Sequence, residues 1–235
     1  MGRDDPPRPR EGRQHAPLSC PEHRFLRLWP LGRPYAKAGD APRLSRGQSR
    51  VGGPIVDLPP GVGYPDGMTF AAQLELAKLA PLDRRELLPA TGYLYFFVGP
   101  QGETGQVFHA DVGARSLVRA VREHEGWFFE GRGIGRISEG TERLEDRYEV
   151  VEDLEGGEAL EWGYNAGAEL TKVYGIYTHC QKGPEEIAAI SASTQVLLLQ
   201  IGEDFTGEGV WSVRIEEDDL RARRFSACVF EWGQS

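Results

Sequence analysis

The sequence predicts a mostly antiparallel β fold with a few short helices, because strand-like patterns recur along much of the chain. Apolar residues alternate from Phe70 to Leu76 with the period of two that buries one face of a sheet. The next apolar segment, 93–98, is apolar on both faces and suits a central strand. A glycine-containing turn leads from it to a strand at 106–112, which completes an antiparallel meander.

The size and composition of the chain indicate a globular protein. Its 235 residues are 40% hydrophobic and 10% aromatic, enough to bury a core as one large domain or two small ones. The three cysteines are widely spaced and form no CxxC pair, so we expect structural thiols. No run approaches the roughly 18 apolar residues of a membrane helix, and charges and prolines occupy the N-terminus. We therefore expect a cytoplasmic protein that does not contact membranes.

Residues 1–48 are predicted to be a largely disordered, basic extension rich in Pro and Arg. They contain half of the sixteen prolines, and too few apolar residues to form a buried face. The segment 23–35 is an exception, because its large apolar side chains could dock on the body. A basic tail can bind nucleic acid or a membrane surface, and an extension without a function is the other interpretation.

Charge is distributed unevenly along the chain. Residues 1–50 contain eleven Lys or Arg and five Asp or Glu, a net charge of +6, so the remaining 185 residues carry −15 of the total of −9. An acidic body repels phosphates, and it lacks a basic stripe interleaved with aromatic residues. Nucleic-acid binding by the body is therefore excluded.

The stretch SRVGGPIVDLPPG, residues 49–61, is interpreted as the first ordered element of a single domain that spans 49–235. Its apolar residues recur with strand-like spacing. Gly52 and Gly53 permit backbone angles or close packing that a Cβ forbids, and the two prolines end the strand. A phosphate-binding loop is excluded, because neither a helix nor a Lys-Ser/Thr pair follows the glycines.

The remaining elements are predicted in order along the chain. A short helical turn is expected at 83–88, a helix at 114–125, and a strand with a glycine-rich loop at 126–138. Segment 147–154 is predicted as a strand, and the acidic stretch 152–161 as a solvated helix or loop. Further strand-like segments lie at 195–204, 209–215 and 223–232.

A degenerate internal repeat is predicted for residues 49–112 and 170–232. Each half has a basic residue followed by Val, then an apolar strand that contains a glutamine, then a strand with aromatic residues that follows a glycine. Gln73 and Gln200 are the matched glutamines. A true repeat implies two similar sheet units around a pseudo-twofold axis with a groove between them, whereas chance similarity of strand pairs is the alternative.

The segments RVGGPIVDLPPG, FAAQLELAKL, GYLYFFV, KVYGIYTHCQ and VLLLQIGED together resemble the YwqG-like family of bacterial proteins of unknown function. The resemblance covers about 49–232 and implies an α+β fold with curved, mostly antiparallel sheets. It implies no enzyme activity, and it suggests a role as an immunity partner of a bacterial toxin. The sequence departs from the family pattern at Ile176-Tyr177 and in GVWSVRI, so the second half is the less typical one.

Four polar residues are candidate binding residues. His109 and Asp111 lie two apart on a predicted strand and share a face, but a metal site needs a third ligand, so we expect solvation or cross-strand hydrogen bonds. Gln73 and Gln200 interrupt apolar strands and need partners if they are buried. They either satisfy backbone groups in nearby loops, which we favour, or contact a ligand from the groove.

The sequence contains no recognisable catalytic set. His179 and Cys180 are adjacent, so on a strand they point to opposite faces and cannot form a nucleophile–base pair. GRGIGRI, residues 131–137, lacks the pattern of a dinucleotide or phosphate loop. We predict a non-enzymatic interaction module, without metal or cofactor, that binds a basic protein partner. The alternatives are a small-ligand-binding protein or hydrolase that uses the groove, and a scaffold.

Overall fold

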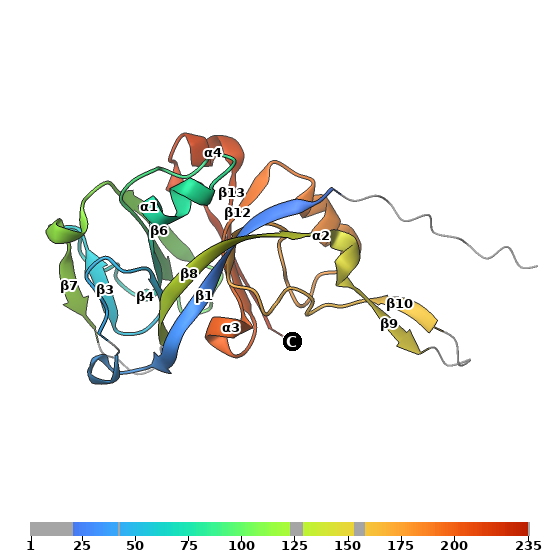
Figure 1. The fold of residues 1–235 in the computed structure, drawn as a ribbon, viewed down its shortest axis with the longest axis horizontal. Coiled ribbons are helices and arrows are strands. Elements are labelled where there is room, and N and C mark those ends of the chain that lie inside the picture. Colours follow the sequence, from blue (N-terminus) through green and yellow to red (C-terminus); the bar gives the residue numbers. More distant parts are fainter. Residues whose placement is uncertain (1–20, 42, 123–128, 153–157, 235) are drawn as a thin grey trace, which may run out of the picture.

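A computed structural model describes residues 21–41, 43–122, 129–152 and 158–234 (Figure 1). Its main feature is a fully antiparallel sheet of ten described strands, which differ in length. Their order is β14-β13-β12-β11-β1-β8-β2-β4-β5-β6. These strands are β1 (His23–Tyr35), β2 (Arg50–Val51), β4 (Thr69–Glu75), β5 (Tyr93–Val98), β6 (Gly105–Ala110), β8 (Gly131–Glu142), β11 (Lys172–Tyr174), β12 (Gln195–Ile201), β13 (Val210–Glu216) and β14 (Val229–Gly233).

The sheet is strongly curved and nearly closed, because its two outer strands approach each other. The ring of Phe230 on β14 lies against Gly105 on β6, where an added Cβ would come within 2.5 Å of the ring. The indole of Trp211 on β13 donates a hydrogen bond of 2.8 Å to the carbonyl of Gly102. The concave face encloses the largest apolar core, which includes the fully buried Leu28 and Leu94.

Two small antiparallel sheets flank the large one. The first pairs β3 (Ile55–Leu58) with β7 (Val118–Val121), and the second pairs β9 (Tyr148–Glu152) with β10 (Glu158–Trp162). The helices are short: α1 (Leu76–Leu79), α2 (Pro184–Ser191), α3 (Glu203–Thr206) and α4 (Glu217–Arg221), with 3₁₀ turns η1 (Ala38–Asp40), η2 (Ala80–Leu82), η3 (Ala114–Ser116), η4 (Leu144–Arg147) and η5 (Phe225–Ala227). None of these described helices has the length and apolar character needed to cross a membrane.

The structure shows how segment 23–35, the expected exception within the N-terminal extension, is attached to the body. It forms β1, which lies in the middle of the sheet between β8 and β11. The physical reason is that Phe25, Leu26 and Leu28 are buried on pairing, while Pro30 lies at a shift in the register with β8, where a missing N–H is tolerated. Residues 1–20 lie outside the described residues.

Several local predictions are also corrected. The helix predicted at 114–125 is instead η3 followed by strand β7, as far as the described residues extend, and 158–162 is strand β10 instead of a helix or loop. The helical turn lies at 76–82, just before the predicted 83–88. The glycine-rich loop predicted within 126–138 is part of the continuous strand β8, where Gly131 leaves room for the ring of Tyr35. The predicted strands at 69–75, 93–98, 148–152 and 195–201 are confirmed.

Candidate functional site

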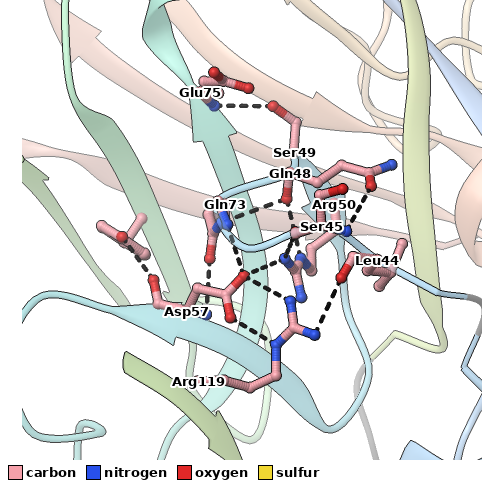
Figure 2. A network of polar contacts seen from close by, with 11 residues as sticks. Leu44, Ser45, Gln48, Ser49, Arg50, Asp57, Gln73, Glu75 and Arg119 are labelled. Carbon is pink, nitrogen blue, oxygen red and sulfur yellow. Dashed lines mark hydrogen bonds and ion pairs between the residues drawn. The ribbon is translucent and has the colours of Figure 1, made fainter. Parts of the chain in front are cut away.

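A buried ionic network fixes the first small sheet to the large one (Figure 2). Arg50 of β2 and Asp57 of β3 form an ion pair whose two side chains are 0% exposed. The guanidinium of Arg119 on β7 binds the same carboxylate from the other side, with Nε 2.8 Å from Oδ1 and Nη2 3.1 Å from Oδ2. Burial alone would raise the pKa of Asp57, but the hydrogen bonds from Arg119 and the charge of Arg50 lower it.

Gln73 belongs to this network. It lies opposite Arg50 in the register of β2 and β4, and its side chain is fully buried. Its Oε1 accepts a hydrogen bond of 2.9 Å from the backbone N–H of Asp57, and its Nε2 donates one of 3.4 Å to the carbonyl of Gln48. Gln73 therefore satisfies backbone groups of β3 and of the loop before β2 within the interior.

A second buried network lies beside β11. The Lys172 ammonium is 2.6 Å from Oε1 of Glu142, and the Arg147 guanidinium is 3.3 Å from Oε2 of the same carboxylate. Burial would raise the pKa of Glu142, but the charges of Lys172 and Arg147 lower it. Burial lowers the pKa of Lys172 to about 8 despite the neighbouring carboxylate. Gln200 lies opposite Lys172, and its Nε2 donates to the carbonyls of Gly167 and Leu170 at 2.9 and 2.8 Å.

This second network fixes the root of the β9–β10 hairpin, which projects away from the sheet (Figure 1). Arg147 ends η4, directly before β9, and donates to the carbonyls of Tyr177 and Ile176 at 3.2 and 3.1 Å. On the other strand, the indole of Trp162 donates to the carbonyl of Lys182 at 3.2 Å. The two strands are thus each attached to the body at the base of the hairpin.

The two faces of the hairpin differ in chemistry. Directly opposed residues share a face. One face carries three such pairs from root to tip: Tyr148 with Trp162, Val150 with Leu160, and Glu152 with Glu158. The other face carries Glu149 opposite Glu161, and Val151 opposite Ala159. Large aliphatic side chains and like-charged pairs are therefore presented together on a projecting element.

The four glutamates of the hairpin have no described cationic partner. None of Glu149, Glu152, Glu158 and Glu161 forms an ion pair with another residue in the part of the chain that the structure describes. Like charges directly opposite each other in an antiparallel pair are destabilising. The hairpin therefore carries negative charge that no cation in the described part of the chain neutralises through an ion pair.

His109 and Asp111 are brought together by a third residue, Thr91. The Nε2 atom of His109 is 2.9 Å from the carbonyl of Thr91, and the Thr91 hydroxyl donates to Oδ1 of Asp111 at 2.8 Å. Thr91 and Asp111 line a shallow pocket of about 300 Å³ together with Glu75 and Tyr93. No group of three or more metal-ligating His, Cys, Asp or Glu occurs among the described residues.

Cys180 is a buried thiol in the described structure. Its side chain packs beside Ala168 and Val210, and burial, followed by the charge of Glu203, raises its pKa. A raised pKa reduces the thiolate fraction on which nucleophilic attack depends.

Comparison with known proteins places the chain in a family. Residues 49–233 match the model of a family described as a domain of unknown function, DUF1963. The chain belongs to the DUF1963 family. No curated protein matches it. The matched range begins at residue 49, so the central strand β1 precedes it, although β1 pairs with two strands of the DUF1963 domain.

Sequence reasoning identified Gln73, Gln200, His109 and Asp111, but not the buried charges around the glutamines. Glu142 is 30 residues from Lys172 in sequence, and nothing in its local pattern marks it as buried. The available signal was Asp57 within the apolar strand IVDL, where a carboxylate needs a partner.

Proposed function

We propose that this DUF1963 domain is a non-enzymatic protein-interaction module whose acidic body binds a basic protein partner. The observation that carries the proposal is the projecting hairpin with its two directly opposed glutamate pairs. The −15 charge of residues 51–235 supports it, because a field of one sign speeds the encounter with an oppositely charged partner and restricts partner choice.

The proposal includes a degenerate internal repeat, in which the β9–β10 hairpin is attached to the second half. The order of the sheet supports it: β2, β4, β5 and β6 follow one another on one side of the β1–β8 pair, as β11, β12, β13 and β14 do on the other. Arg50 lies opposite Gln73 as Lys172 lies opposite Gln200. In this interpretation a buried cation–carboxylate network attaches one small sheet to each half. We call the β3–β7 sheet the first accessory sheet and the β9–β10 hairpin the second accessory sheet.

The resemblance to the YwqG-like family extends the proposal to a cytoplasmic bacterial protein. An immunity protein must bind its toxin tightly, and toxins that act on nucleic acids need basic surfaces, for which an acidic hairpin is a complement. The negative charge of the hairpin is the observation that supports the immunity role.

The test is capture of partners from the native cell on the immobilised full chain at low and moderate salt. We expect a protein that is retained at low salt and released at moderate salt, because ions screen charges that are more than about 8–10 Å apart. Failure to retain any salt-sensitive protein contradicts the proposed function.

A small-ligand-binding function is the alternative, and the pocket at Thr91 is the observation that favours it. The pocket volume of about 300 Å³ is at the lower end of ligand cavities. Its lining residues all lie between Glu75 and Ala114, within the first half, and not in a groove between the halves. A thermal-shift screen of metabolites against the wild type and Thr91→Val tests it, because a native-state ligand raises the unfolding temperature.

A further inference from the structure

We propose that the β9–β10 hairpin is the docking element of this protein, and that it takes a segment of a protein partner in which apolar side chains stand next to Lys or Arg. This inference rests on the proposed function and specifies the surface and the chemistry of its partner. Three observations carry it: an exposed aliphatic pair, two unneutralised glutamate pairs, and a root that is held by buried groups.

The aliphatic pair is the apolar part of the surface. Val150 is 64% exposed and Leu160 is 69% exposed, and they lie directly opposite each other on one face of the hairpin. Tyr148, on the same face, is 39% exposed. A contiguous group of large apolar side chains on a projecting element is typical of an interaction site, whereas single exposed apolar residues need no explanation.

The glutamates restrict the partner to a basic one. On the face of the aliphatic pair, Glu152 and Glu158 lie just beyond Val150 and Leu160, toward the tip. Glu149 and Glu161 form the second pair on the opposite face. Lys or Arg side chains of a bound segment would neutralise carboxylates that now face each other, while apolar side chains of the same segment would cover the aliphatic pair.

The root of the hairpin determines how these groups are presented. Tyr148 and Trp162 pack edge to face with ring centroids 5.3 Å apart, and Trp162 is anchored through its indole N–H. Arg147, adjacent to Tyr148, is 4% exposed and is bound by Glu142 in the second buried network. An isolated two-stranded hairpin is marginally stable in water, so this anchoring is what lets it present a defined surface.

Charge also argues against two other occupants of the apolar face. A second copy of this chain seated on this face would bring its Glu152 and Glu158 toward the same two residues, and an anionic membrane surface would repel them. A basic protein segment is the occupant that satisfies both the apolar and the acidic part of the surface.

The experiment uses the full chain and labelled synthetic peptides of about six residues, the usual length of a strand. The first peptide alternates pairs of valine with pairs of lysine, so that each side of an extended strand carries both residue types. The second alternates pairs of serine with pairs of lysine, and the third pairs of valine with pairs of glutamate. Binding is followed by fluorescence anisotropy. We expect the valine–lysine peptide to bind more tightly than both others, because it alone supplies apolar contact and positive charge.

Two hairpin variants and one matched control locate the binding. The variants are Val150→Ser with Leu160→Ser, and Glu152→Gln with Glu158→Gln. The control is Val118→Ser with Val121→Ser on β7, where the side chains are 57% and 54% exposed. We expect each hairpin variant to weaken valine–lysine binding about tenfold, as for loss of central interface residues, and the control to bind like the wild type. Urea midpoints of all three report whether the fold is retained.

The outcomes separate this inference from the proposed function. If the wild type prefers the valine–lysine peptide no more than the serine–lysine peptide, or the hairpin variants bind as the wild type does, the docking assignment is wrong. Capture of a salt-sensitive cellular partner by both wild type and hairpin variants leaves the proposed function intact and also overturns the assignment. Hairpin-dependent dimerisation, or hairpin-dependent sedimentation with phosphatidylglycerol vesicles, assigns the face to a different occupant and overturns it.

Discussion

Asp57 neutralises Arg50 in an ion pair from which solvent is fully excluded, and Arg119 binds the same carboxylate from a third strand. One carboxylate therefore serves two guanidinium groups. Removal of this carboxylate should have a large effect on stability, because the remaining Arg50 cation is still buried.

The substitution Asp57→Asn is expected to destabilise the protein by about 3–5 kcal/mol, because it leaves the buried guanidinium of Arg50 uncompensated. The measurement is the free energy of unfolding from urea titration. Glu139→Gln is the control, since Glu139 and its partner Arg84 are 38% and 63% exposed and the pair contributes little. Equal stability of Asp57→Asn and wild type would show that the network does not hold the first accessory sheet.

Stability is expected to fall in acid because of Asp57 and Glu142. Both have a pKa below the ordinary values of 3.8 and 4.5, despite burial, because of neighbouring cations. A carboxylate with a lowered pKa in the folded state stabilises the fold at pH values above the unfolded-state pKa, and that stabilisation is lost as the pH falls through the folded-state pKa. We expect the urea midpoint to drop between about pH 5 and about pH 3.

The variant Glu142→Gln separates this effect from general acid denaturation. It lowers stability at neutral pH, but its stability depends less steeply on pH in the acid range, because one titrating group has been removed. An acid slope identical to that of the wild type would show that Glu142 does not have a lowered pKa in the folded protein.

The strands that are apolar on their own were predictable, and those that depend on distant neighbours were not. Segments 93–98 and 195–201 are buried along their length, and their composition shows it. Strand β1 is buried because it pairs with β11 and with the part of β8 that ends at Glu142, both more than a hundred residues away. Its prolines and arginines are typical of an exposed segment, so its own sequence does not predict a central strand. Strand β10 has two glutamates among its five residues and no buried side chain, so its composition does not predict a strand.

The candidate site was predictable in part for the same reason. Gln73 and Gln200 were recognisable because a glutamine in an apolar strand needs partners, and both are buried and bonded to backbone carbonyls or N–H groups. Their ligand-binding role remains a prediction. The pairing of Asp57 with Arg50 and of Glu142 with Lys172 was not predictable, because it follows from how the small sheets fold back on the large one.

Gly52→Ala is expected to destabilise the protein strongly. The residue has φ of 59°, and an added Cβ would lie 2.4 Å from the carbonyl oxygen of Glu130. Gly61→Ala is the control: φ is 78°, but no atom lies within 4 Å of the added Cβ, so only the left-handed backbone costs about 1–2 kcal/mol. Thermal unfolding should place Gly52→Ala well below Gly61→Ala, and similar melting temperatures would contradict the close approach of the backbones.

Cys180 and Cys228 are expected to react slowly with thiol reagents in the native protein. Burial, with a smaller effect of Asp219, raises the pKa of Cys228 to about 12, and burial also raises the pKa of Cys180. A Cys20→Ser variant removes the third thiol, so that Ellman's reagent at about pH 8 reports these two alone. Labelling should be fast only in denaturant, and rapid labelling of either thiol in the native protein would show that it is accessible and ionised.

The like-charge pair Glu149–Glu161 is expected to weaken the hairpin locally. The single variant Glu161→Lys places opposite charges across the strands, which should stabilise the pairing by about 0.2–1 kcal/mol. Hydrogen exchange of the β9 and β10 amides should therefore slow, up to about fivefold if the upper value holds.

The double variant Glu149→Lys with Glu161→Lys is the matched control, because it restores repulsion with the opposite sign. Its exchange should return to the wild-type rate, whereas each single variant remains slower, and added salt should reduce the differences. Exchange that is insensitive to all three changes would mean that the two carboxylates are already neutralised. The negative charge of the hairpin would then come from Glu152 and Glu158 alone, on the face of Val150 and Leu160.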